Sequence, residues 1–567
     1  MSVQLDLTNY PFSRLGSYFS ILMVPGEGLF LHTHHDGSVR AFRLEPVRDR
    51  TVLEFSTTAT ETELTITPSG GGEVRIVISG PKTVRIWGRG VSFRLEMPKE
   101  RWTTACELPG GAWGFNMSRH GVQLGLEMIG GQLQIDAPWG HYRGFCKESV
   151  HMIAELVPGD DGTFDAAIDE FVTTWVRPHR PGFDACREEV RGEYERWRVG
   201  LPGVAPRHEA ARDLAAYVNW AATVDPSGYL KRRTMLMSKV SMCNVYHWDN
   251  AFNAMAHARH QPELAWDQFM VMSSTQDAFG KCAANMNDKA INYTFSNLPI
   301  QGWALKRMWR DNPELKTPAR MREAYDYLAG WSEWLCNRTW PGDALPYCTH
   351  GFDNWDNATI FDDGVPVVTP DVSAYLVSQL DVVAELAEEL KRGEEASTWR
   401  KRRDVIFGEL IDKLWKDDHF VGLRRPSGKV IECESLIVCM PIMLGRVLPQ
   451  RVIEPLVAQV REHLTPWGLA TEKLSSSEYT ENGYWRGPIW APTTMLVVAG
   501  LMDIGEDELA RTIAEAFCRM CVQHGFYENF DPTTGKGLCD PAYTWTSSVF
   551  MILAGMLQVT DTSLSAT

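Results

Sequence analysis

The spacing of apolar residues differs between the first 170 residues and the rest of the chain, and this difference most limits the possible folds. Residues 91–97 alternate Val91, Phe93, Leu95 and Met97 with polar residues, which is the period of a half-buried strand. Nearby runs show the same habit and are separated by glycine-rich turns, namely ELTITP, EVRIVIS and TVRIWGRG. Many short strands with such turns predict an antiparallel β-sandwich.

Helical spacing begins at residue 183. One apolar stripe contains Phe183, Cys186, Val190, Tyr194 and Trp197, three or four residues apart, before LPGVAP ends the helix. From about residue 207 helical patterns dominate, in EAARDLAAYVNWAATV, MREAYDYLAGWSEWLCNRTW and DVSAYLVSQLDVVAELAEELKRG. We expect the last helix to take Asp371 as its N-cap and to end at Gly393.

These patterns divide the chain into parts. A chain of 567 residues exceeds one compact core of ordinary size, so more than one domain is expected. We expect a β-sandwich domain at 1–178, a helical linker at 179–206 and a mainly α catalytic domain at 207–567. Long polar and aromatic loops lie between the helices of this last part, and loops of that length usually carry function.

Charge and composition exclude several classes of function. The net charge of −16 argues against a nucleic-acid partner and disfavours an anionic membrane surface. No apolar run is long enough to span a bilayer, and the first residues show no secretory signal. Twelve cysteines without repeated spacing suggest reduced thiols, so we expect a cytoplasmic protein. The sequence makes no prediction of the oligomeric state.

A histidine-rich run, HTHHD at 32–36, has the composition of a metal site. It lies within the β region and its aspartate is followed by Gly37, which together predict a hairpin turn. No second set of metal-ligating residues accompanies it. We therefore expect neither a metal nor another cofactor.

Four loops each place an aromatic residue beside a carboxylate or an amide. A pyranose stacks its C–H face on an aromatic ring and binds Asp, Asn and Arg through its hydroxyls. Cleavage of a glycosidic bond needs two carboxyl groups. The composition predicts a site for a small carbohydrate, built from NVYHWDNAF (244–252), HGFDNWDNATIFDDG (350–364), ENGYWRGPIW (481–490) and FYENFDPTTGKG (526–537).

The run YWRGPIWAPTTM (484–495) is unusual in a soluble protein. It carries two tryptophans, and the prolines at 488 and 492 oppose a regular helix. Trp485 and Trp490 either fill a packed core or form the wall of a cavity for a flat-faced, hydroxyl-rich ligand.

Several of these runs, in the same order, resemble the bacterial branch of glycoside hydrolase family 63, which is related to the trehalases and the processing glucosidases. The resemblance covers roughly residues 208–557 and rests on WDNAF, NWDNATIFDDGVPVVTPD, YWRGPIW, YENFDPTTGKG and YTWTSSV. It implies an (α/α)6 barrel that hydrolyses a terminal α-glucosidic bond of a small glucoside or short oligosaccharide with inversion.

The resemblance also implies residue roles. Asp356 matches the family's general acid and Glu528 its general base. Asp353 remains an alternative acid because the glycine of the acid motif stands earlier here, in HGFD. The positions expected to bind the sugar are Trp248, Asp249, Phe252, Trp355, Asn357, Trp485, Arg486, Trp490 and Trp545.

Two other functions remain open at the level of sequence. A disaccharide phosphorylase can use the same barrel with phosphate in place of water and one catalytic carboxyl group, although no glycine-rich phosphate loop is evident. A protein that binds carbohydrate without cleaving it is the third possibility.

Overall fold

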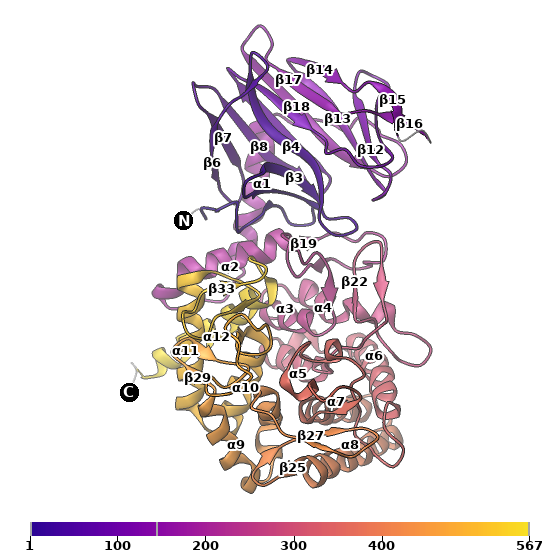
Figure 1. Cartoon of the computed structure of the whole chain (residues 1–567), viewed down its shortest axis with the longest axis vertical. Helices are drawn as coiled ribbons and strands as arrows, with labels where there is room; N and C mark the ends of the chain where they lie inside the picture. Colours follow the sequence, from indigo (N-terminus) through magenta and orange to yellow (C-terminus); the bar gives the residue numbers. More distant parts are fainter. Residues whose placement is uncertain (1–2, 143–145, 565–567) are drawn as a thin grey trace.

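A computed structural model describes residues 3–142 and 146–564 and shows a β-sandwich beside a helical domain (Figure 1). Antiparallel pairs build both sheets of the sandwich. In spatial order the first sheet contains β1 (Phe12–Ser13), β2 (Phe19–Val24), β3 (Gly28–Thr33), β4 (Val39–Arg48), β10 (Ser92–Glu96), β17 (Ile153–Val157) and β14 (Gln132–Asp136), with β5 (Thr51–Val52) paired to β4. The second contains β11 (Thr103–Glu107), β12 (Trp113–Met117), β13 (Val122–Gly130), β18 (Thr163–Phe171), β9 (Thr83–Arg89), β8 (Glu73–Gly80), β7 (Leu64–Pro68) and β6 (Phe55–Ala59).

The predicted β-sandwich is confirmed. Strand β10 buries Phe93 and Leu95 while its polar residues are half-exposed, as the alternation predicted. The two sheets share one core, in which Phe42 of β4 packs edge-on against Phe115 of β12 at 5.1 Å between ring centroids. Burying one face of each sheet supplies most of the driving force for this layer arrangement.

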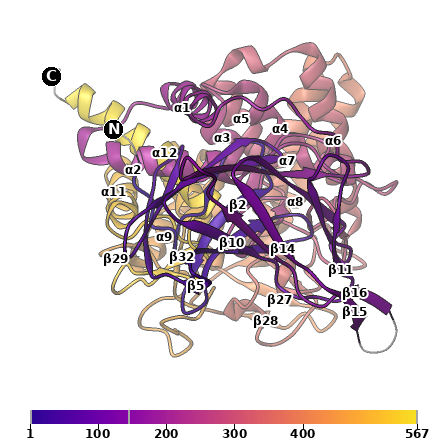
Figure 2. The ribbon, with the colours of Figure 1, turned by 90° about the horizontal axis from the view of Figure 1, so that it is seen from above.

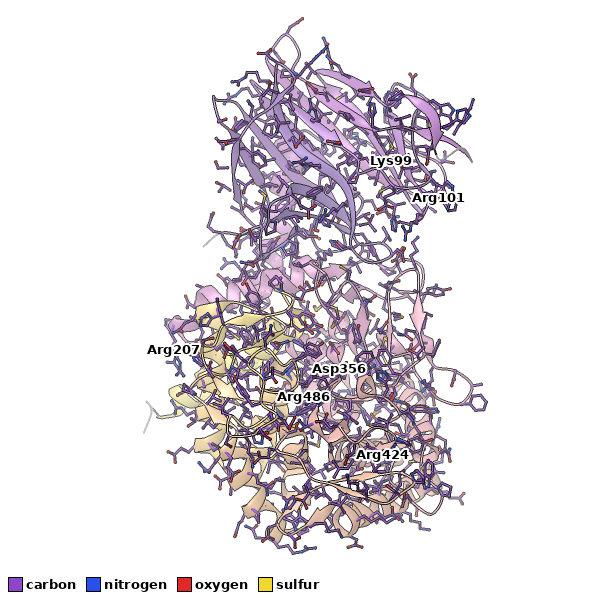
Figure 3. All side chains as sticks on the ribbon, viewed as in Figure 1. Lys99, Arg101, Arg207, Asp356, Arg424 and Arg486 are labelled. Atoms are coloured by element: carbon purple, nitrogen blue, oxygen red, sulfur yellow. The ribbon has the colours of Figure 1, made fainter. Side chains whose placement is uncertain are left out.

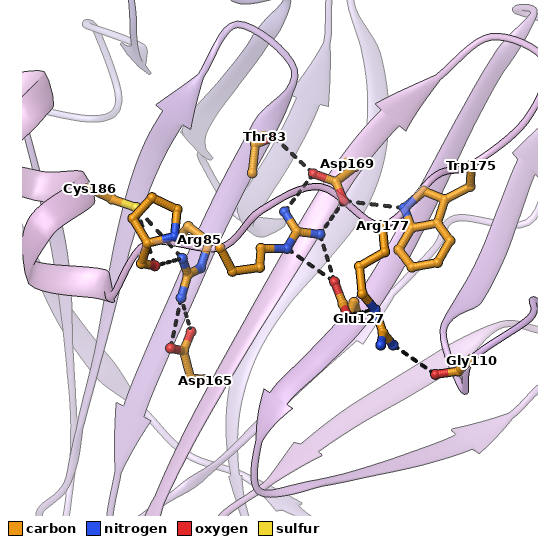
Figure 4. A network of polar contacts seen from close by, with 11 residues as sticks. Thr83, Arg85, Gly110, Glu127, Asp165, Asp169, Trp175, Arg177 and Cys186 are labelled. Atoms are coloured by element: carbon orange, nitrogen blue, oxygen red, sulfur yellow. Dashed lines mark hydrogen bonds and ion pairs between the residues drawn. The ribbon is translucent and has the colours of Figure 1, made fainter.

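Helix α1 (Phe183–Val199) follows the sandwich and buries the predicted stripe of apolar residues. Phe183 and Val190 pack against Val77 of β8, whereas Tyr194 and Trp197 pack edge-on against Trp220 of the helical domain. The segment before it is fixed to the sandwich by ion pairs (Figure 4). Arg85 binds both oxygens of Asp165 and donates to the carbonyl of Pro181. Arg180 binds Glu127 and Asp169. These contacts therefore hold the segment that connects the two domains against the β-sandwich.

The helical domain is built from paired helices. Its inner helices are α3 (Asp249–His257), α5 (Gln301–Asp311), α7 (Pro370–Glu389), the 3₁₀ segment η6 (Leu436–Val447), α10 (Ala491–Ile504) and α12 (Thr544–Leu564). Each contacts the next in this order, and α12 contacts α3, which closes a ring. Outside it lie α2 (Glu209–Ala222), α4 (Pro262–Met270), α6 (Pro318–Asn337), α8 (Gly393–Leu414), α9 (Gln450–Glu462) and α11 (Asp507–His524).

Two sequence predictions about helix boundaries were wrong. Helix α7 takes Thr369 as its N-cap, with Pro370 as the first helical residue, and it ends at Glu389. Lys391 then adopts a left-handed backbone with φ of 63°, so Gly393 begins α8 instead of ending α7. Pro492 lies in the first turn of α10, where a missing N–H leaves no hydrogen bond unmade.

The sandwich lies over the helical domain when the molecule is seen from above (Figure 2). Its first residues contact two loops of the helical domain. Tyr527 donates a hydrogen bond to Asn9, and the buried Lys239 donates to the Ser13 hydroxyl and the Ser17 carbonyl. The N-terminal domain therefore supports the loops that precede Glu528 and surround Lys239. No helix within the described ranges is long and apolar enough to cross a membrane.

The histidine-rich run forms the predicted hairpin turn, in which Asp36 and Gly37 both have positive φ. His35 lies between two carboxylates, with Nε2 at 2.9 Å from Glu170 of β18 and Nδ1 at 2.6 Å from Asp288 of the helical domain. Burial alone would lower the pKa of His35, but the hydrogen bonds and charges of Asp288 and Glu170 raise it to about 9. The histidine therefore joins the two domains as a cation.

We expect His35→Gln to destabilise the protein by ~3 kcal/mol, because it removes the cation between two buried carboxylates and leaves them only the more distant Lys82, 3.9 Å from Glu170, and Lys289, 3.8 Å from Asp288. The pKa is raised in the folded state, so this stabilisation is complete below the unfolded pKa of about 6.5 and is lost as the pH rises through about 9. Thermal denaturation of both proteins at pH 6 and pH 9.5 tests this. The exposed pair of His151 and Asp136 provides the control His151→Gln, which should cost less than ~1 kcal/mol. Equal melting temperatures for His35→Gln and wild type at pH 6 would contradict the account.

Candidate active site

A cavity of about 400 Å³ opens among the loops of the helical domain. Its volume lies within the range of small-molecule sites. Three carboxyl groups, four amides and a set of aromatic side chains form the lining. These residues are Asp249, Asp356 and Glu528; Asn285, Asn292, Asn297 and Asn354; Tyr246, Tyr484 and Tyr543; Trp248, Trp485, Trp490 and Trp545; Phe295 and Phe352; and Met242.

The cavity lies at the N-terminal ends of inner helices. Trp248 is the N-cap of α3, Trp490 is the N-cap of α10, and Trp545 is the second residue of α12. Residues at helix ends project from a fixed backbone, so the tryptophans keep their relative positions. Trp485 and Trp490 stack with 3.9 Å between ring centroids, and Trp545 meets Trp490 edge-on at 5.6 Å. The run YWRGPIWAPTTM (484–495) therefore forms a wall of the cavity, and its two tryptophans are also tightly packed.

Glu528 is held by the short sheet of β31 (Ile489–Trp490), β32 (Asn529–Phe530) and β33 (Gly537–Leu538). It immediately precedes β32, and Trp490 pairs with Asn529 in the register, so Glu528 lies next to the tryptophan loop. Its backbone N–H donates to the Asp540 carbonyl at 2.8 Å. Its side chain accepts a hydrogen bond from the Tyr484 hydroxyl at 2.9 Å.

Asp356 lies between two short 3₁₀ turns, η4 (Gly351–Asp353) and η5 (Thr359–Phe361). A Cβ at Gly351 would lie 1.7 Å from the carbonyl oxygen of Asp356, so only glycine allows the loop to close here. Trp485 donates its indole N–H to Asp356 at 2.8 Å. Tyr484 and Trp485 are consecutive, so one short segment holds both carboxyl groups at a fixed separation.

Burial changes the acidity of all three carboxyl groups in the cavity. It raises the pKa of Asp356 to about 6 and that of Glu528 to about 7, against the hydrogen bonds from Trp485 and Tyr484, which lower them. Burial also raises the pKa of Asp249 well above its ordinary value, as do the charges of Glu528 and Asp356. Between about pH 6 and pH 7, Asp356 and Glu528 therefore share about one proton.

Asp353, the alternative acid, has no free oxygen to offer. It is bound to Arg338 at 2.7 Å and accepts hydrogen bonds from Ser296, Thr349 and His350. Burial alone would raise the pKa of Asp353, but the charge of Arg338 and these hydrogen bonds hold it below its ordinary value. A carboxylate that stays ionised in this way suits a structural role, whereas a general acid needs a raised pKa.

The structure brings most of the predicted residues to the cavity. Asp356, Glu528, Trp248, Asp249, Trp485, Trp490 and Trp545 line it. Four others do not and instead support the wall from behind. Phe252 packs edge-on against Trp248, and the fully buried Trp355 stacks on Trp485 at 4.8 Å.

Asn357 and Arg486 join two adjoining loops of the helical domain, where Figure 3 labels Arg486 near Asp356. Asn357 accepts from the backbone N–H of Trp485 at 3.0 Å and donates to the carbonyl of Gly483. Arg486 pairs with Asp362 and Glu478 and donates to the carbonyl of Asn357. The guanidinium is thus occupied by protein groups, which places it away from the sugar hydroxyls that the sequence assigned to it.

Sequence reasoning missed more than half of the lining residues. Tyr484 stood inside the quoted motif, but its contact with Glu528 depends on a left-handed backbone with φ of 62°, which a non-glycine residue seldom adopts. The polar loop after residue 277 gave only a general signal for function. It supplies Asn285, Asn292, Phe295 and Asn297. No cluster of three metal-ligating side chains occurs among the described residues.

We expect Tyr484→Phe to lower kcat about 10- to 100-fold, because a hydrogen bond to a charged group contributes ~1.5–3 kcal/mol. The hydroxyl favours the ionised form of Glu528, so its loss raises the pKa of Glu528, which sets the limb near pH 7, and moves that basic limb of the pH–kcat profile to higher pH. A pH profile with unchanged limbs would show that the tyrosine has only a packing role. The control Tyr229→Phe changes an exposed ring outside the lining and should leave both limbs in place.

Comparison with known proteins places these observations in a family. Residues 242–546 match the family model of the mannosylglycerate hydrolase MGH1-like glycoside hydrolase domain. The chain is 29% identical over 214 residues to a mannosylglycerate hydrolase of Rubrobacter radiotolerans, covering 35% of this chain and 46% of the relative. It is 24% identical over 261 residues to a probable mannosyl-oligosaccharide glucosidase of Schizosaccharomyces pombe, covering 41% and 31%. The chain therefore spans less than half the length of these relatives.

Solved structures show the same fold at low sequence identity. A GH63 mannosylglycerate hydrolase from Thermus thermophilus, in complex with glucose, superposes with a TM-score of 0.54 at 17% identity, over 60% of this chain and all of that chain. A bacterial glucoamylase complexed with acarbose gives 0.63 at 10% identity, over 98% and 94%. The second likeness extends over nearly the whole chain, so it includes the sandwich as well as the helical domain.

Proposed function

Since the chain belongs to the MGH1-like glycoside hydrolases of glycoside hydrolase family 63, we propose that it is an exo-acting α-glucosidase that hydrolyses a terminal α-glucosidic bond with inversion. One observation carries this proposal. Two buried carboxyl groups, Asp356 and Glu528, lie in one tryptophan-walled cavity and are held by the consecutive residues Tyr484 and Trp485. Glycosidic cleavage requires such a pair.

In the proposed mechanism Asp356 is the general acid and Glu528 the general base. Asp356 gives its proton to the glycosidic oxygen as the bond to the anomeric carbon breaks. Glu528 takes a proton from the water that attacks the opposite face of the sugar. The Tyr484 hydroxyl supports the ionised form of Glu528. Burial raises the pKa of both groups, to about 6 for Asp356 and about 7 for Glu528, so the singly protonated pair holds its proton mainly on Glu528 and reacts through the minor form in which Asp356 carries it.

The proposed glucosyl subsite is enclosed by aromatic rings. Trp248, Trp485, Trp490 and Trp545 offer faces and edges for the C–H surface of a pyranose. Asp249 Oδ2 has no hydrogen-bond partner in the described part of the chain, and a sugar hydroxyl would supply one. We take the closed ring of helices as the (α/α)6 barrel of the family, with the subsite at the N-terminal ends of its inner helices.

The names of the relatives favour a second substrate, mannosylglycerate. Glucose and mannose differ only in the orientation of the C2 hydroxyl, so one panel separates the two. We would assay release of glucose and mannose from α-linked glucose disaccharides, glucosylglycerate and mannosylglycerate in phosphate-free buffer. Release of glucose would support the proposed α-glucosidase. Release of mannose alone would show that the substrate is an α-mannoside instead. Turnover that depends on added phosphate would instead indicate a phosphorylase, and binding without product a non-catalytic protein.

The pH dependence of kcat/KM should be bell-shaped with an optimum between pH 6 and pH 7. The singly protonated pair is the active form. Below about 6 both carboxyl groups are protonated and the base is lost, whereas above about 7 both are ionised and the acid is lost. Initial rates between pH 4 and pH 9 measure both limbs. A rate that stays constant from pH 5 to pH 9 would be inconsistent with this pair.

A further inference from the structure

The lining of the cavity contains two groups of residues of different character. Tryptophans bind the loops of the two catalytic carboxyl groups, while Asn285, Asn292, Asn297, Phe295 and Phe352 form a second group of amides and phenylalanines. These five residues, which we name the amide rim, come from the segment 285–297 and from the loop that also holds Asp356. On the proposed function, the amide rim would receive the group on the far side of the cleaved bond.

The amides of this rim retain free hydrogen-bonding capacity. Asn285 has no side-chain partner among the described residues. Asn292 accepts from Thr294 through its oxygen, which leaves its NH₂ group free. Asn297 donates to the Ala284 carbonyl at 2.7 Å, which leaves its oxygen free. Together they offer both donors and acceptors, which is what hydroxyl groups need.

Two phenylalanines provide the apolar part of the rim. Phe295 and Phe352 lie 5.5 Å apart between ring centroids, and the side chain of Phe352 is 49% exposed. An exposed aromatic ring at the mouth of a sugar cavity can stack on a second ring. Three amide groups with a free donor or acceptor and an aromatic platform therefore suit an uncharged, polyhydroxylated group such as another sugar.

The charges around the cavity also favour an uncharged aglycone. All ionisable groups that line it are acidic or phenolic, and the pair of Asp356 and Glu528 retains about one negative charge at neutral pH. Two guanidinium groups in the neighbouring loops are already paired, Arg338 with Asp353 and Arg486 with Asp362. The nearby His350 packs on Phe352 at 4.4 Å between ring centroids and uses Nδ1 to accept from the Phe352 N–H, and no arginine or lysine lines the cavity, so a carboxylate on the aglycone would meet like charge from the catalytic pair.

The position of the rim is fixed by the N-terminal domain. Asn285 and Asn292 belong to β22 (Asn285–Met286) and β23 (Ile291–Asn292), and Asp288 lies in the turn between these strands. Asp288 is held by His35 and by the backbone N–H of Asp36, at 3.1 Å. The sandwich thus fixes the hairpin that carries two of the amides.

We propose that this enzyme selects an uncharged, hydroxyl-rich aglycone through the amide rim and discriminates against an anionic one such as glycerate. The inference rests on the glycosidase activity proposed above. It differs from what the names of the relatives suggest, since glycerate carries a carboxylate at neutral pH.

The test compares glucosylglycerate with its primary amide, which has nearly the same shape and no charge. We expect kcat/KM at pH 7 to be at least tenfold higher for the amide, with the difference shrinking as salt is added. Equal rates, or faster cleavage of the acid, would overturn the inference and leave the glycosidase intact. If neither compound is cleaved, the proposed function fails for this linkage. Calorimetric binding of both compounds to the wild type then decides the inference, and tighter binding of the acid would overturn it.

Variants of the rim provide a second readout. Phe352→Ala should lower kcat/KM for a neutral disaccharide about fivefold to tenfold, whereas Phe279→Ala, an 80% exposed phenylalanine outside the lining, should not change it. Asn285→Lys introduces a cation and should reduce the ratio of kcat/KM for the amide to kcat/KM for the acid. If Asn285→Lys leaves that ratio unchanged, the rim does not select by charge.

Discussion

Replacing Glu528 by Gln is expected to lower kcat by at least ~10³-fold with little change in melting temperature, because general-base catalysis contributes ~10²–10⁴-fold and glutamine cannot accept the proton of the attacking water. Glutamine has the same shape as glutamate and can still accept the hydrogen bond that Tyr484 donates. The fold should therefore survive the change. Steady-state kinetics and thermal denaturation of the same preparation separate the two effects.

The matched control is Glu481→Gln, an exposed glutamate of the loop that carries Tyr484 and Trp485. It should keep wild-type kinetics. Azide offers a further test. When it is added to the Glu528→Gln enzyme, this small anion can take the place of the missing carboxylate and should restore part of kcat. A Glu528→Gln enzyme that keeps more than a tenth of the wild-type kcat would remove this residue from the mechanism.

Replacing Asp356 by Asn should cause a loss of similar size, ~10²–10⁴-fold, for substrates with a sugar leaving group. Asparagine cannot protonate the glycosidic oxygen. The loss should depend on the leaving group, since fluoride departs without full protonation. We therefore expect the variant to hydrolyse α-glucosyl fluoride within about tenfold of the wild-type rate, which measurement of fluoride release would show.

Two neighbouring aspartates serve as comparisons for Asp356. Asp363 forms an exposed ion pair with Lys429 at 2.6 Å, so Asp363→Asn should leave kcat and the melting temperature unchanged. Asp353 balances the buried charge of Arg338, so Asp353→Asn should lower the melting temperature more than it lowers kcat. If Asp353→Asn abolished turnover while Asp356→Asn kept wild-type rates, the acid would have been assigned to the wrong residue.

The sequence predicted the parts of this protein that depend on local pattern. The β-sandwich followed from the period of two around Phe93, and α1 followed from its apolar stripe. The boundary between α7 and α8 could not be predicted, because the break depends on a left-handed backbone at Lys391, a residue type that ordinarily favours helix.

The candidate site, too, could be predicted only in part from the sequence. The resemblance to a family placed Asp356 and Glu528 in one cavity, but it could not give the direction of a side chain. Arg486 turns toward Asp362 and Glu478 and away from the sugar, because those carboxylates lie on the outer side of its loop. Asn285 reaches the cavity through a hairpin that His35 fixes from the other domain, and no pattern within either segment records that contact.

The most direct test of the central claim is a proton NMR time course of the hydrolysis of an α-glucoside in phosphate-free buffer. We expect β-glucose to appear first and α-glucose to grow only as the sugar mutarotates, since the water guided by Glu528 attacks the face opposite the leaving group. Initial release of α-glucose would rule out inversion and would make one of the two carboxylates a nucleophile.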